Sequence, residues 1–186
     1  MTWLMRMSRV VWLVLAGSMV ALAAHAQDTA APVVVPTLVD ATLDSMRGGQ
    51  RTLSAERGHR VVVLFYEDRD HVEDNSAFKG DLNRFVVDNH LDDRVVMYGV
   101  ANLAEVGMVP QALVRQMIAP LVDRWGSDIL LDWNGTMRSA PFSFPTSATT
   151  CAMIDRSGAI TYRYTGVIDE AQRRTFYRML RAAIAR

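Results

Sequence analysis

The sequence predicts an α/β protein: a three-layer sandwich in which a mixed central sheet carries helices on both faces. Three observations lead to this fold class. Residues 61–66 (VVVLFY) form an unbroken apolar run, typical of a strand that is covered on both faces. Two amphipathic helical patterns then alternate with further strand-like runs. The chain ends in a hairpin pattern followed by a third helix, an order typical of layered α/β domains.

The first half of the domain contains a hairpin, the buried strand, a helix and another strand. Residues 37–43 and 50–53 are extended runs on either side of a glycine pair, which predicts the hairpin. A helix is expected over residues 71–89, and residues 94–100 (RVVMYGV) predict the strand after it. The apolar positions of that helix recur at helical spacing: Phe78, Leu82, Phe85 and Val86.

The second half begins with a helix opened by Pro110. Its apolar side chains recur at helical spacing: Val114, Met117, Ile118, Leu121, Val122 and Trp125. We interpret them as core packing and not as a cofactor pocket. Residues 129–133 predict a short strand, and residues 150–154 and 159–164 a hairpin. Asp169 is expected to cap a last helix whose apolar face holds Phe176, Leu180, Ala183 and Ile184.

Residues 1–26 have the organisation of a secretory signal peptide. Two arginines precede an apolar run, which ends in Ala24-His25-Ala26. The run is shorter than the roughly 20 apolar residues that a spanning helix needs, so we expect cleavage after Ala26 and no stable membrane insertion afterwards. Residues 27–36 are interpreted as a linker and residues 37–186 as one domain. The expected location is the periplasm or the outside of the cell.

Composition excludes several classes of protein. The chain has 20 basic and 20 acidic residues, and loss of the two leader arginines leaves 20 − 2 = 18 basic residues against 20 acidic ones. Nucleic-acid binding is not expected without a basic excess. The single cysteine cannot form an internal disulfide. The partner is expected to be an envelope protein or peptide that the sequence does not identify.

The order of elements resembles the thioredoxin-like superfamily over most of the domain. In that superfamily an aromatic strand end leads into a Cys-x-x-Cys pair at the start of a helix, and a later strand begins at a cis-proline. Phe65 and Tyr66 match the aromatic strand end. The resemblance places Asp70 and Glu73 at the two cysteine positions and Thr149 near that of the cis-proline. This chain therefore lacks the cysteine pair.

The sequence is similar in more detail to the secreted YtfJ family, whose function is largely unassigned. The shared features are a signal peptide, no Cys-x-x-Cys pair, and an asparagine early in the first helix, here Asn75. An aromatic residue before a strand that ends in Asp-x-Asn-Gly completes the resemblance, here Trp125 and residues 132–135.

The acidic residues after the buried strand have two interpretations. Asp70 and Glu73 have the spacing of a capping box, which accounts for both acids without catalysis. Residues 67–74 hold five acids and His71, enough oxygen ligands for a hard cation such as calcium, but without the spacing of a calcium loop. We favour a solvated loop that suits the helix N-terminus, and we expect no metal and no cofactor.

Cys151 lies within a predicted central strand, and a free cysteine in that setting usually behaves as a small apolar residue. The favoured hypothesis is a non-catalytic binding or adaptor module of the cell envelope. Its candidate surface is the edge where thioredoxins carry their active site, formed here by Asp70, His71, Glu73 and Thr149. The alternative is a thiol-dependent oxidoreductase or peroxidase that uses Cys151. Divalent-metal binding by the acidic loop is a third possibility.

Overall fold

The computed structural model describes residues 37–186, so the predicted signal peptide and linker lie outside the described residues. The order of elements is the predicted one. The strands are β1 (Thr42–Ser45), β2 (Gln50–Thr52), β3 (Val61–Glu67), β4 (Val95–Asn102), β5 (Asp128–Asp132), β6 (Thr150–Ile154) and β7 (Ile160–Thr165). The helices are α1 (Ser76–Asp88), α2 (Gln111–Trp125) and α3 (Glu170–Ile184), with two short 3₁₀ helices, η1 (Leu53–Glu56) and η2 (Thr136–Arg138).

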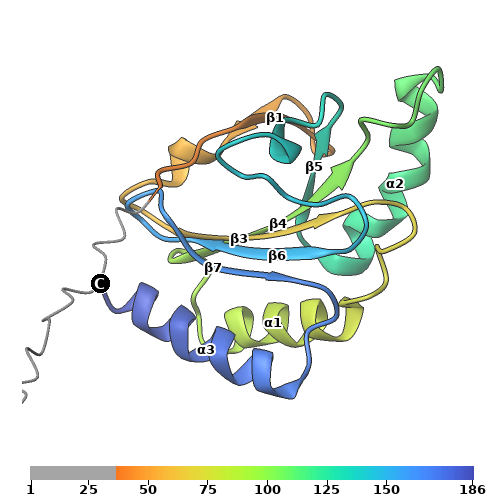
Figure 1. The fold of residues 1–186 in the computed structure, drawn as a ribbon. Helices are drawn as coiled ribbons and strands as arrows, with labels where there is room; N and C mark the ends of the chain where they lie inside the picture. Colours follow the sequence, from red (N-terminus) through yellow and green to blue (C-terminus); the bar gives the residue numbers. More distant parts are fainter. Residues whose placement is uncertain (1–36) are drawn as a thin grey trace, which may run out of the picture. The chain divides into compact units, whose positions relative to one another are not determined.

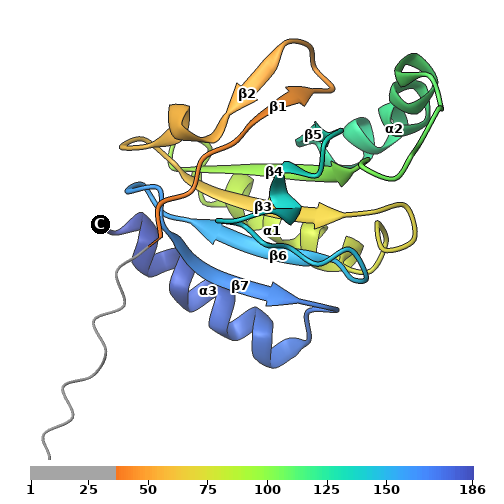
Figure 2. The ribbon, with the colours of Figure 1, turned by 45° about the horizontal axis from the view of Figure 1, so that its top comes forward.

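The strands form one mixed sheet in the order β2-β1-β5-β4-β3-β6-β7 (Figure 2). Strands β3, β4 and β5 are parallel to one another, whereas β1 and β6 join them antiparallel. The fully buried strand β3 lies between β4 and β6. Both faces of β3 are covered, which explains why residues 61–66 form an unbroken apolar run.

One face of the sheet packs against α1 and α3, which lie side by side beneath it (Figure 1). Aromatic rings dominate this layer: Phe176 meets Phe78 and Tyr162 edge to face, with centroids 5.1 and 5.2 Å apart. Cys151 and Met153 of β6 close the layer from the sheet side. The predicted apolar faces of both helices are therefore buried as expected.

The opposite face is covered by short helical turns and loops. Leu53 of η1, Met137 of η2 and two phenylalanines from the segment after η2, Phe142 and Phe144, pack on it. The rings of Tyr66 and Phe144 pack at a tilt of 49°, with centroids 5.5 Å apart. Both faces of the sheet are thus covered: the α-helices lie on one face, and the 3₁₀ helices and loops lie on the other.

Helix α2 lies on the same side of the sheet as α1, over β4 and β5. At Gly99 of β4 the side chains of Ile129 and Trp125 pack closely over the backbone, 3.4 and 3.5 Å from where a Cβ would lie. Unlike α1 and α3, α2 has a single buried residue, Val114. No helix of the described residues is long and apolar enough to span a membrane.

Candidate functional site

The end of β3, the start of α1 and the start of β6 meet at the place where the resemblance puts the thioredoxin cysteines. A buried ion pair lies there. Lys79 Nζ donates to Glu67 Oε2 at 2.8 Å and to Oε1 at 3.1 Å, and both side chains are only 4% exposed. Lys79 is the only lysine of the chain. A charge pair buried this deeply requires its remaining hydrogen bonds to be met inside the protein.

The surrounding groups meet those requirements. Thr149 donates its hydroxyl to Glu67 Oε1 at 3.0 Å, and Lys79 also donates to the backbone oxygen of Val72 at 2.8 Å. The ring of Trp125 lies 3.6 Å from Lys79 Nζ, which is a close cation–π contact. The pair is therefore enclosed between the sheet, α1 and the last turn of α2.

Burial and pairing act in opposite directions on these two groups. Burial raises the pKa of Glu67 to about 7, while the charge and hydrogen bonds of Lys79 pull that pKa down. Burial likewise lowers the pKa of Lys79, and Glu67 opposes this shift. Each charge thus stabilises the other in a place where neither would be stable alone.

Asn75 joins three segments at this site. Its side chain donates to the backbone oxygen of Gly166 at 3.2 Å and to Thr149 Oγ1 at 3.4 Å, and it accepts from the backbone N–H of Ile168 at 2.8 Å. Asn75 was noted in the sequence only for the YtfJ resemblance. Here its role is structural, since it fixes the start of α1 to the turn after β7.

The capping-box prediction for Asp70 and Glu73 is wrong. Helix α1 begins at Ser76, after a series of turns, and not near His71. Asp68 causes this delay, because its Oδ1 accepts from the backbone N–H groups of Asp70 and His71 at 2.9 and 3.0 Å. A side chain that captures amides in this way competes with the helix for them.

The acids that were assigned to the cap have other contacts or none. Glu73 accepts from the hydroxyl of Ser76 and from Arg124 of α2, both at 2.6 Å. Asp70 is exposed. The His71 ring donates through Nδ1 to Asp68 Oδ1 at 2.7 Å, and this hydrogen bond raises the pKa of His71.

The four residues proposed as a candidate surface do not lie together at the surface. Asp70 and Glu73 are exposed and His71 is half-buried. Thr149 is fully buried beneath them, bonded to Glu67. Within residues 37–186, no three His, Cys, Asp or Glu side chains gather closely enough to hold a metal ion.

Cys151 is buried, as predicted. It is 0% exposed in β6, where it pairs with Phe65 of β3 and Tyr164 of β7. Burial raises the pKa of its thiol well above the ordinary value. A thiol that is buried and protonated is a poor nucleophile, because the thiolate is the reactive form.

The turn after β5, at residues 132–135, is also structural. Asp132 accepts from the backbone N–H groups of Thr136 and Met137 at 2.7 and 2.9 Å, which holds η2 against the sheet. Gly135 has a φ of +67°, a backbone conformation that favours glycine. This Asp-x-Asn-Gly segment therefore builds a turn.

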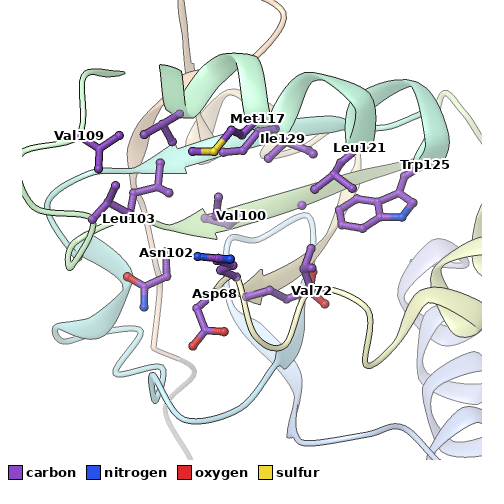
Figure 3. Close-up of a pocket in the computed structure, with 17 residues that line it drawn as sticks. Asp68, Val72, Val100, Asn102, Leu103, Val109, Met117, Leu121, Trp125 and Ile129 are labelled. Atoms are coloured by element: carbon purple, nitrogen blue, oxygen red, sulfur yellow. The ribbon is translucent and has the colours of Figure 1, made fainter. Parts of the chain in front are cut away.

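A large apolar cavity opens beside the ion pair (Figure 3). Its volume is about 570 Å³. Helix α2 forms one wall, strands β4 and β5 form the floor, and the loop after β3 closes one end. The apolar lining of α2 consists of Val114, Met117, Ile118, Leu121 and Trp125.

The cavity corrects the interpretation of α2 as a core-packing helix. Met117, which was expected to pack, is 60% exposed, and Leu121 and Trp125 are half-buried at the cavity wall. Helical spacing shows that a helix has an apolar face, but not what covers that face. Helical spacing alone therefore does not distinguish a filled interface from an open one.

Comparisons with known proteins agree with this architecture. No family model matches the chain, and no curated protein matches it. Among solved structures, a putative protein disulfide isomerase from Bacteroides thetaiotaomicron is 16% identical, with a TM-score of 0.62 over 81% of this chain and 89% of the other. The fold is thioredoxin-like.

Two further thioredoxin-like structures are similar over most of their length. A putative thiol:disulfide interchange protein DsbE from Chlorobium tepidum is 16% identical, with a TM-score of 0.59 over 80% of this chain and 96% of the other. An exposed lipoprotein thioredoxin from Streptococcus pneumoniae is 17% identical, with a TM-score of 0.58 over 77% and 99%. At these identities the likeness establishes the fold alone.

Proposed function

We propose that this protein is a non-catalytic binding module of the cell envelope, built on a thioredoxin-like fold. One observation carries the proposal: a buried Glu67–Lys79 ion pair lies beside the turn with Asp70 and Glu73, where the resemblance places the redox cysteines. Thioredoxin chemistry requires an activated thiolate at a helix N-terminus and a second thiol to resolve the mixed disulfide. The only thiol of this chain is Cys151, which is 0% exposed.

The cavity beneath α2 supplies the binding site. A concave apolar site with a few polar groups at one end is the usual form of a ligand pocket. It lies beside the ion pair, so binding takes place next to the edge that thioredoxins use for catalysis. The leader-like residues 1–26 support a location in the periplasm or outside the cell.

We further propose kinship with the secreted YtfJ family. Two features support this kinship. Asn75 donates to Thr149, which in turn donates to Glu67 of the ion pair, and the Asp-x-Asn-Gly segment at residues 132–135 forms the turn after β5. The partner remains an envelope protein, a peptide or a small molecule that this edge can bind.

The test is the reaction rate of Cys151 with a disulfide reagent, measured on the purified protein when folded and when denatured. We expect the thiol to react only after denaturation, and we expect no turnover of peroxide or of a protein disulfide. The Cys151→Ser variant provides the blank for the thiol assay. A folded thiol that reacts faster than the denatured one, with turnover lost in Cys151→Ser, would favour the oxidoreductase alternative.

A further inference from the structure

The α2 cavity has an apolar interior and a single charged end. Its interior is formed by aliphatic side chains of α2 and of the β4–α2 connection, together with Val100 and Ile129 of the sheet. Three charged residues line it, Glu67, Asp68 and Arg69, and all belong to the end of β3 and the loop after it. A ligand that fills the cavity therefore has an apolar body and one polar end.

The two acids at the charged end are already paired. Glu67 is neutralised by Lys79, and Asp68 accepts from the His71 ring and from two backbone N–H groups. Arg69 is exposed, and within residues 37–186 its guanidinium has no hydrogen bond or ion pair. Among the described residues that line the cavity, the one uncommitted charge is therefore a cation.

We propose that the α2 cavity binds a fatty acid, with the hydrocarbon chain against α2 and the carboxylate paired with Arg69. This inference rests on the proposed binding function and names its ligand class. A guanidinium pairs with a carboxylate through two parallel hydrogen bonds, which a neutral head group cannot reproduce. The hydrocarbon chain would cover apolar side chains that the fold leaves open to water, among them Met117.

A cationic amphiphile fits less well. It would need a free carboxylate at the cavity, and Glu67 and Asp68 are both engaged. Displacement of Lys79 would leave a buried ammonium without its partner, which is costly.

The test is calorimetric titration of the purified protein with octanoate, decanoate and dodecanoate, each below its micellar concentration. If the chain enters the cavity, each added methylene should tighten binding about fourfold, so two carbons should give roughly fifteenfold. Dodecanol, which has the same chain without the charge, should bind at least tenfold more weakly than dodecanoate.

Two pairs of variants locate the site. Arg69→Ala should weaken the binding of dodecanoate about tenfold and leave the binding of dodecanol unchanged. Arg174 is an exposed arginine of α3, and Arg174→Ala should change the binding of neither ligand. Met117→Gln should weaken the binding of both ligands. Leu113→Gln is the matched control, because Leu113 is also an exposed apolar residue of α2 but does not line the cavity.

Three results of these titrations would overturn the inference: no binding of any fatty acid, equal binding of dodecanol and dodecanoate, or equal losses of binding in Leu113→Gln and Met117→Gln. Binding of an apolar peptide in place of fatty acids would also overturn it. These results leave the proposed binding function intact as long as Cys151 stays unreactive. A reactive Cys151 with disulfide turnover would refute the proposed function whatever the titrations give.

Discussion

Helices α1 and α2 both present an apolar face to the same side of the sheet, yet their surroundings differ. The face of α1 is filled by the rings of Phe176 and Tyr177 from α3, with Phe78 at the centre. The face of α2 meets Gly99 and Ile129 at one end and an open cavity along the rest. Within residues 37–186 the difference is the presence of α3, which covers α1 but not α2.

This difference separates the parts of the fold that confer stability from the part available for binding. A filled aromatic layer stabilises the fold through close packing, and few substitutions preserve that packing. An open apolar wall contributes little to stability, because its side chains remain in contact with water. The Glu67–Lys79 ion pair lies at the border of the two regions, held by α1 and covered by Trp125 of α2.

The largest expected effect is in the filled layer. Phe176→Ala removes a ring that contacts Phe78 and Tyr162, and we expect a loss of about 4 kcal/mol in the free energy of unfolding. Met117→Ala on α2 should cost less than about 0.5 kcal/mol. Urea unfolding of both variants measures the two costs, and similar values would contradict the contrast between the helices.

The ion pair should give the next largest effect. Lys79→Met leaves a buried carboxyl without its partner, and we expect a loss of about 3 kcal/mol near pH 8. Without Lys79 the pKa of Glu67 rises above the value of about 7 that it has in the intact pair, and its ordinary value is 4.5. A raised carboxyl pKa stabilises the folded state at low pH and loses that contribution as the pH rises.

The deficit of Lys79→Met should therefore grow as the pH rises above 7, which unfolding at pH 6 and pH 9 can measure. The double variant Glu67→Gln, Lys79→Met removes both charges and should recover at least half of the loss. A deficit that is independent of pH, or a double variant less stable than Lys79→Met, would show that the two groups do not act as a pair.

The smallest effect distinguishes a real cap from an apparent one. Asp169 caps α3, where its side chain accepts from the backbone N–H of Gln172 at 2.8 Å. We expect Asp169→Ala to cost about 1 kcal/mol, and Asp70→Ala to cost nothing measurable, since Asp70 lies outside α1. Equal costs in thermal unfolding would restore the capping role of Asp70.

The fold could be predicted because its signals are local and repeated. The run at residues 61–66, the helical spacing of Phe78 and Leu82, and the turn glycines each specify one element, and their order specifies the topology. Burial of Cys151 followed from its place in a central strand. The predicted start of α1 was wrong because Asp68 accepts hydrogen bonds from two backbone N–H groups before the helix begins. Residue spacing does not reveal this competition.

The candidate site could be predicted only in part. The sequence located the edge after β3, but it assigned Glu67 to an acidic loop and gave Lys79 no role. One signal was present: Lys79 stands three and seven residues before Leu82 and Val86, on the apolar face of α1. A lone lysine on such a face needs a buried acid, and Glu67 directly follows the buried run. The open cavity beneath α2 depends on tertiary packing and has no local signal.

The most direct measurement of the central claim is hydrogen exchange along the three helices of the folded protein. Amides in α1 and α3 should exchange only through global unfolding, whereas those of α2 should exchange through local opening at a much lower free energy. Dodecanoate should slow exchange in α2 and leave α1 unchanged. Equal protection of α1 and α2 in the free protein would contradict the account, since it would mean that α2 is as firmly packed as the helices of the closed layer.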